Sequence, residues 1–327
     1  MQKKFTLCLT GLVLCAAAST FPVSADSAQD YPRKQIRFIV PYTPGGGTDA
    51  LARVIAENLR KGLGQGIVVE NRPGADGRLG TDILAKAAPD GYTVALIASV
   101  HSIHPSLFKK LPYDPVKDFE AITLAGSSPS LLVVHPSLSV KSVEELVTLA
   151  KSKPGKFNYG TAGLGQAPHL AGELFKTMAG IDIMNVPFKG GGEVTIALLG
   201  GHLEMAFGSI PTYISHVKAG TLKALAITSA KRSTLALDVP TMVESGFPGF
   251  VTATWYGVLA PAGTPRQVVT RLNAEIVKIL KTPDLGALLQ GMGVEPSTST
   301  PEEFAEYIKS EIVRWGKVLK FAGIQPE

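Results

Sequence analysis

The residues with the clearest chemical potential are the glycines at Pro41–Asp49, because a glycine-rich backbone can approach a ligand closely. This turn follows an apolar run at Ile36–Val40 that predicts a strand, and it precedes residues with helical spacing. The free N–H groups and the positive dipole end of such a helix start can bind an anion. A plain strand-to-helix turn with Thr48 or Asp49 as the N-cap is the alternative. The candidate ligand contacts in this turn are Tyr42, Gly46, Gly47, Thr48 and Asp49.

A second turn of similar chemistry lies at Asn158–His169, again between a predicted strand and a predicted helix. A third, Lys189–Glu193, opens another helix, and its lysine either lines the same site or is an exposed loop residue. His169, in the first turn of its helix, either packs and caps locally or contacts the ligand. Two such helix starts facing each other across a cleft would hold an anion without any arginine. The candidate contacts in these turns are Thr161, Ala162, Gly163, Gly165, Gln166, His169 and Lys189.

The donors in these turns are sufficient for a useful affinity. A carboxylate with a micromolar dissociation constant needs about 8 kcal/mol of net binding free energy. A hydrogen bond to a charged group contributes roughly 1.5–3 kcal/mol. We therefore expect that about four to six amide or hydroxyl donors, with some apolar contact, suffice after the ordering costs.

The first turn also fits a dinucleotide-binding fingerprint, as Gly45-x-Gly47-x-x-Ala50 with Glu70 at the end of the next predicted strand. Two prolines within the turn oppose this interpretation. An export signal at the N-terminus also opposes it, because nicotinamide cofactors are not expected outside the cytoplasm. No Gly-Lys-Ser/Thr follows the glycines, so a Walker A motif is absent. We expect no cofactor.

The sequence offers little for catalysis or metal binding. No Gly-x-Ser-x-Gly elbow occurs, and both cysteines lie in the predicted leader. His101 and His104 form the one close histidine pair, and Pro105 predicts a loop there, so we expect no zinc site. Asp49 either caps its helix or binds the ammonium group of an amino-acid ligand. We therefore expect no catalytic residue and no metal, and do not expect an enzyme.

The N-terminal residues have the composition of a secretory signal peptide. Lys3 and Lys4 precede an uncharged, mostly apolar run at Phe5–Ala18, which is too short to span a bilayer. The small residues at 23–25 predict cleavage before Asp26, so the signal peptide is expected at residues 1–25 and the mature chain in the periplasm. The net charge is only +5 in 327 residues and forms no basic stripe, so we expect no nucleic-acid partner.

Strand and helix patterns alternate through the rest of the chain, which predicts an α/β protein with a mostly parallel sheet. A new series begins at residue 157, so a second α/β unit lies inside the chain. We expect domain 1 at residues 26–128 and 251–327, domain 2 at residues 129–250, and crossing segments near 126–130 and 250–256. Thr264 and Thr300, each before a proline, predict two helix N-caps. Trp255 and Tyr256 either line the ligand pocket or pack in the crossing.

Nine short motifs occur in order along the mature chain, at residues 44–49, 70–75, 118–119, 158–170, 186–192, 198–201, 238–241, 259–265 and 314–315. Each motif is weak alone, but their shared order is specific. Together they resemble the motifs of the periplasmic receptors of tripartite tricarboxylate transporters, also called Bug receptors. The chain departs from the family pattern at Thr161 and Gln166, where serine is frequent, and at Asp76, where glycine is usual.

The resemblance implies a two-domain periplasmic binding protein of the Venus-flytrap kind, similar to type II binding proteins. It implies that main-chain amides and ordered waters at residues 44–49 meet a ligand carboxylate, and that residues 160–166 close from the other domain. The expected ligand is a small organic carboxylate, the expected partner is a membrane permease, and the expected state is a monomer. A sensory co-receptor, or an enzyme acting on a carboxylate, is the alternative.

Overall fold

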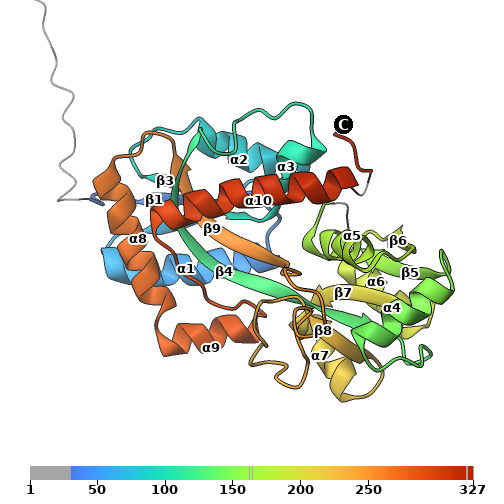
Figure 1. Ribbon diagram of the computed structural model, residues 1–327. Coiled ribbons are helices and arrows are strands. Elements are labelled where there is room, and N and C mark those ends of the chain that lie inside the picture. The colour runs from blue at the N-terminus through green and yellow to red at the C-terminus, as the bar shows by residue number, and fades with distance from the viewer. Residues whose placement is uncertain (1–30, 162, 164, 322, 327) are drawn as a thin grey trace, which may run out of the picture.

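The computed structural model describes residues 31–327 except 162, 164, 322 and 327, so the predicted leader at residues 1–25 and Ala162 lie outside the described residues. The described chain forms a two-lobed α/β molecule (Figure 1). The strands are β1 (Ile36–Val40), β2 (Ile67–Asn71), β3 (Thr93–Ala98), β4 (Phe119–Val134), β5 (Phe157–Thr161), β6 (Ile183–Pro187), β7 (Met205–Ser209), β8 (Lys223–Ile227) and β9 (Ala253–Pro261). The helices are α1 (Gly47–Leu63), α2 (Arg78–Ala85), α3 (Val100–Leu107), α4 (Val143–Ser152), α5 (Ala167–Ala179), α6 (Gly191–Leu199), α7 (Ile210–Lys218), α8 (Arg266–Leu280), α9 (Pro283–Gly291) and α10 (Pro301–Phe321).

A nine-stranded sheet runs through both lobes in the order β2-β1-β3-β9-β4-β7-β5-β6, with β8 paired to β4. Within the first lobe β1 pairs in parallel with β2 and β3, and within the second lobe β5 pairs in parallel with β6 and β7. The pairings of β4 and β9 are all antiparallel. The expectation of a mostly parallel sheet is therefore wrong at the centre, because the strands that cross between lobes and back must run in opposite directions.

The two crossing segments are β4 and β9, which pair with each other. Ser128 lies opposite Thr254, where the crossings were predicted, and Figure 1 shows β4 as a long strand running from one lobe into the other. Thr228 joins the two segments beside the sheet. The Ser130 N–H donates to Thr228 Oγ1 at 2.9 Å, and the Thr228 hydroxyl donates to the Thr252 carbonyl oxygen at 2.6 Å. The segments are thus held together at the crossing.

Apolar cores fill both lobes, and the last helix contributes to each of them. Phe304 and Ile308 of α10 belong to a core of the first lobe, around Trp255. Trp315 and Leu319, further along the same helix, belong to the core of the second lobe. Burying such side chains stabilises a fold by roughly 1.5–3 kcal/mol each. The helix that was assigned by sequence to domain 1 therefore packs on both lobes.

The two predicted caps of the late helices differ in outcome. Thr300 and Glu303 form a reciprocal capping box at the start of α10, with N···O distances of 2.8 and 3.1 Å. The predicted cap at Thr300 is therefore confirmed. The predicted cap at Thr264 is wrong, because Pro265 is the N-cap of α8. The buried Thr264 hydroxyl donates instead to the Pro261 carbonyl oxygen at 2.7 Å, which closes the loop before the helix.

Candidate functional site

The first glycine-rich turn joins β1 to α1 and is exposed from Thr43 to Gly47. Gly46 is the N-cap of α1, so neither Thr48 nor Asp49 is the N-cap that the alternative interpretation of this turn required. The amides of residues 47–49 open the helix, and the described residues provide no acceptor for them. An exposed turn of this form presents backbone donors and the positive end of the helix dipole to a ligand.

Asp49 holds this turn in shape. Its Oδ2 accepts a hydrogen bond from the Gly45 N–H at 2.9 Å and one from Arg53 Nε at 3.1 Å. Its Oδ1 accepts from Asn71 Nδ2 at 2.9 Å. Burial would raise the pKa of Asp49, but these hydrogen bonds outweigh burial and hold the pKa below its ordinary value. Asp49 is thus not the N-cap, but its carboxylate is held within its own turn, which disfavours the recognition of an ammonium group.

The second glycine-rich turn, between β5 and α5, closes in the same way with a neutral side chain. Gln166 is the N-cap of α5, and the Gly165 N–H donates to His169 Nδ1 at 3.1 Å. Burial lowers the pKa of His169, so the imidazole stays neutral and can accept this bond. The Thr161 hydroxyl, buried at the end of β5, donates to Asn185 Oδ1 at 2.7 Å. The exposed Gln166 side chain is therefore a freer polar group than Thr161.

The third turn repeats this geometry before α6, but with an acidic side chain at its centre. The Lys189 N–H donates to Glu193 Oε2 at 3.1 Å, and Gly190 is the N-cap. No ion pair with Glu193 is found in the described part of the chain. Its carboxylate therefore offsets the positive end of α6. The third turn is less suited to an anion than the turn at α5, and the exposed Lys189 stands at its edge.

Helix α3 of the first lobe packs against the second turn. A Cβ atom on Gly165 would lie 2.6 Å from Leu107 Cδ1 and 3.7 Å from Ile103 Cγ2 of α3, so the turn packs tightly on this helix. The φ of +75° at Gly165 favours glycine. Figure 1 shows α3 and α5 on either side of α10, at the junction between the lobes. The turn at Gly163–His169 therefore packs on the first lobe and does not lie at the far end of the molecule.

Tyr256 of β9 reaches the first turn from the crossing. A Cβ atom on Gly47 would lie 3.9 Å from the Tyr256 hydroxyl, and burial raises the pKa of Tyr256 to about 12, so the hydroxyl keeps its proton. Tyr42, just before the turn, lies near Tyr256 and is half-buried. Trp255 instead packs against Phe304 in the core. Trp255 therefore packs at the crossing, whereas the Tyr256 hydroxyl lies beside the first turn.

The histidine pair lies inside α3. The prediction of a loop at Pro105 is wrong, because Pro105 occupies the last turn of this short helix, where its missing N–H removes a single hydrogen bond. His101 Nε2 lies 2.9 Å from the Pro115 carbonyl oxygen, and burial lowers the pKa of His101 to about 4. Among residues 31–327, as far as they are described, no group of three or more His, Cys, Asp or Glu side chains is arranged to hold a metal.

Glu70, the acidic residue of the dinucleotide fingerprint, is held by arginines. Arg37 donates to both of its oxygens at 2.9 and 3.0 Å, and Arg72 donates to Oε2 at 2.9 Å. These bonds, that of Arg37 first, lower the pKa of Glu70 to about 2. A carboxylate paired in this way is poorly placed to accept hydrogen bonds from a ribose, so the geometry does not favour dinucleotide binding.

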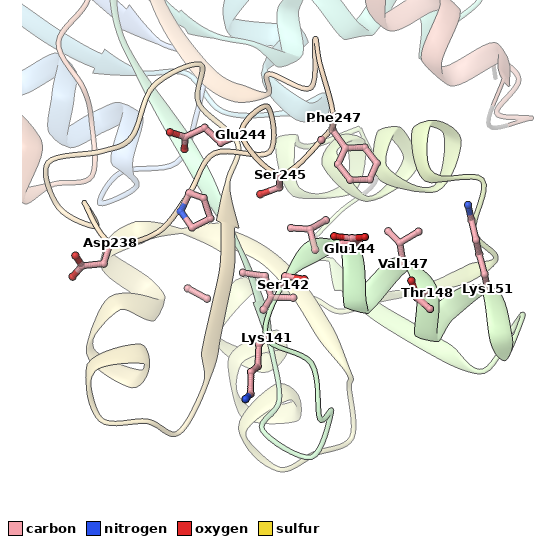
Figure 2. A pocket seen from close by; sticks show the side chains of 15 residues that line it. Lys141, Ser142, Glu144, Val147, Thr148, Lys151, Asp238, Glu244, Ser245 and Phe247 are labelled. Atoms are coloured by element: carbon pink, nitrogen blue, oxygen red, sulfur yellow. The ribbon is translucent and has the colours of Figure 1, made fainter.

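A separate pocket of about 820 Å³ lies in the second lobe, between α4 and residues 238–247. Figure 2 shows Glu144 and Lys151 along α4, with Phe247 on the opposite segment. The pocket mixes acidic and basic side chains, and Asp238 adds a further negative charge at its rim. None of its lining residues belongs to a glycine-rich turn. We therefore do not assign a carboxylate to it.

Comparison with known proteins shows the family of the chain. The profile described as "Tripartite tricarboxylate transporter family receptor" matches residues 51–324, which include most of both lobes. The chain belongs to this receptor family. This tripartite tricarboxylate transporter receptor is similar to Protein BugT of Bordetella pertussis, with 38% identity over 97% of each chain.

Two solved structures resemble this receptor closely in fold. Rpa4515 of R. palustris, solved with adipate, is 37% identical with a TM-score of 0.77, over 91% of this chain and 100% of that one. MatC of Rhodopseudomonas palustris, solved with bound malate, is 33% identical with a TM-score of 0.72, over 88% of this chain and 100% of that one. In the receptor itself, no helix of the described residues is long and apolar enough to cross a bilayer. The family resemblance and the two-domain α/β fold predicted from the sequence are confirmed.

Proposed function

We propose that the chain is a periplasmic solute-binding receptor that captures a small organic carboxylate and presents it to a membrane permease. Membership of the tripartite tricarboxylate transporter receptors supports the receptor role. The adipate and malate in the two similar structures support a carboxylate as the ligand. The protein catalyses no reaction in this proposal, because binding and release are sufficient for a receptor.

The observation that carries the proposal is the pair of open helix starts at α1 and α5. The amides of residues 47–49, and those of Ala167 and His169, have no acceptor in the described part of the chain. The carboxylate that closes the α1 turn is neutralised by Arg53, and the α5 turn is closed by a neutral imidazole. Both helix starts therefore keep the positive character that an anionic ligand requires.

The predicted contact residues take distinct roles in this site. Gly46 and Gly47 leave the backbone accessible, while Thr48 and Gln166 add side-chain donors. Tyr42 precedes the first turn. Tyr256, which the sequence assigned either to the pocket or to the crossing, adds a hydroxyl donor beside Gly47. The remaining described members act by shape or at the edge of the site, and they are Asp49, Thr161, Gly163, Gly165, His169 and Lys189.

Transport requires that the permease distinguish the loaded receptor from the empty one. We propose that the two lobes close on the ligand, because only a bound carboxylate holds both turns together, and that the permease binds the closed form. The export signal at residues 1–25, domain 1 at residues 26–128 and 251–327, domain 2 at residues 129–250, and a monomeric state are further parts of this proposal.

A thermal-shift screen of the mature protein against di- and tricarboxylates, aromatic acids and amino acids tests the proposal. A ligand at one hundred times its dissociation constant adds about 2.7 kcal/mol of stability, so a true ligand should raise the Tm by about 5 °C. Incubation with that ligand, followed by product analysis, should return it unchanged. A panel without any stabilising carboxylate, or one that yields a reaction product, would contradict the proposal.

A further inference from the structure

Asp76 occupies a backbone position that suits glycine better. It lies in the short 3-10 turn Ala75–Gly77, between β2 and α2, with φ +56° and ψ +39°. These angles are in the left-handed region, which glycine adopts without strain and other residues adopt rarely. The chain therefore keeps a carboxylate where a residue without a side chain would be less strained.

The Asp76 carboxylate has no cationic partner among the described residues. His104 Nε2 lies 3.6 Å from Asp76 Oδ2, which is too long for a hydrogen bond. Arg78, two residues further on, donates to the Ala75 carbonyl oxygen and lies over the Phe108 ring, so it does not pair with Asp76. The Asp76 side chain is 43% exposed, which leaves its oxygens accessible to a ligand.

His104 supplies a second unsatisfied group at the same place. The residue is 1% exposed, and its Nε2 has no hydrogen-bond partner in the described part of the chain. Its Nδ1 lies 3.2 Å from the Tyr113 hydroxyl. When Nδ1–H donates to that hydroxyl, Nε2 of the neutral imidazole keeps its lone pair free, and this lone pair faces Asp76. A buried acceptor of this kind needs a donor, and a hydrogen-bond donor held at Asp76 would provide one.

The Asp76–His104 pair lies next to the proposed carboxylate site. Burial and, to a smaller extent, the charge of Asp76 raise the pKa of Tyr42, the residue before the first turn. Helix α3, which carries His104, packs against Gly165 of the second turn. A ligand held by the amides of both turns would therefore bring its remaining atoms close to this pair.

We propose that Asp76 and His104 form a second recognition point, which binds the protonated amine of an amino-substituted carboxylate. The inference rests on the proposed function, because the two turns must hold the ligand's carboxylate. A carboxylate without a counterion, near the aromatic rings of Tyr42 and Tyr113, attracts an ammonium group and repels a second carboxylate. Asp49, the carboxylate that the sequence offered for an ammonium group, is already held within its own turn.

Titration calorimetry with matched compounds tests this inference. The probes are succinate, glutarate and adipate, their α-amino derivatives, and the ω-amino acids of the same carbon number. The wild-type protein should bind at least one aminated compound about tenfold or more tightly than the matched diacid. Asp76→Asn and Asp76→Gly should each remove this preference by weakening the aminated compound alone. Asp76→Gly should keep the wild-type Tm, because glycine suits the left-handed backbone.

Asp82→Asn is the matched control, because it removes one negative charge of the same lobe from a residue that pairs with Lys86. This variant should keep the preference of the wild type. A wild-type protein that binds diacids better than their aminated forms, or Asp76 variants that keep the preference, would overturn the inference and leave the carboxylate receptor intact. A wild-type protein that binds no compound of the series would overturn this inference, and the proposed function would fall with it only if the wider carboxylate screen also yielded no ligand.

Discussion

Substitution of Gly47 by leucine should abolish ligand binding without unfolding the protein. Gly47 is the exposed first residue of α1, and a Cβ atom there would approach no atom closer than 3.9 Å. Leucine therefore needs no rearrangement of the backbone, and its better helix propensity is worth at most about 1 kcal/mol. For a protein of this size that corresponds to a change in Tm of about 3 °C or less.

The effect of Gly47→Leu on affinity should be far larger. The new side chain would cover the amides of residues 47–49 and occupy the space beside the Tyr256 hydroxyl. Each hydrogen bond to a carboxylate contributes roughly 1.5–3 kcal/mol, so the loss of two of them weakens binding by about 10²- to 10⁴-fold. A micromolar ligand would then bind at best in the range of about 0.1 mM or weaker.

Calorimetry with the tightest carboxylate of the screen, together with thermal unfolding, measures both quantities. Gly286→Leu is the matched control, because it makes the same change in α9, where a Cβ atom meets nothing within 4 Å. The control should bind like the wild type. If Gly47→Leu retains an affinity within about threefold of the wild type, the amides of the first turn do not bind the carboxylate and our reasoning is refuted.

Three further predictions concern stability and are measured by urea unfolding. Gly257→Ala would place a Cβ atom 2.0 Å from Phe304 Cζ, so it should lower the free energy of unfolding by about 1–3 kcal/mol. An unchanged urea midpoint would show that Phe304 can move aside without cost. Arg37 holds the pKa of Glu70 near 2, below its ordinary 4.5, so this ion pair stabilises the fold above pH 4.5 and is lost as the pH falls towards 2. Glu70→Gln should therefore reduce the loss of stability across that range, by about 1 kcal/mol or less because Arg37 is partly exposed; identical slopes would contradict this. Thr300→Ala should cost about 1 kcal/mol through its lost cap and leave ligand affinity unchanged, so an unaltered stability would argue against the cap.

The parts of the site that the sequence predicts well are determined by neighbouring residues. The turns at Gly45–Asp49 and Gly163–His169 lie where glycines separate a short apolar strand from an amphipathic helix, and both occur there in the structure. The capping box of Thr300 is equally local, since its two members are three residues apart. Such features need no knowledge of the rest of the fold.

The parts that the sequence does not predict depend on residues distant in the chain. The partners of Asp49 include Asn71, which reaches it only because β2 pairs with β1. The approach of His104 to Asp76 requires α3 to pack beside the turn before α2. The sequence did not predict this helix, because Pro105 within it indicated a loop. Thr264 fails as a cap because its hydroxyl has a closer acceptor in the preceding loop. In each case a tertiary contact outweighs the local signal.

The dual packing of α10 has a consequence for dissecting the protein. A fragment comprising residues 129–250 contains every strand and helix that lies only in the second lobe, yet it lacks Trp315, Val318 and Leu319, which pack in that lobe's core. Expressed by itself, this fragment would leave that apolar surface in contact with water and should be poorly soluble. Adding the sequence of α10 in trans should restore a folded complex, so the C-terminal helix completes two hydrophobic cores with one continuous element.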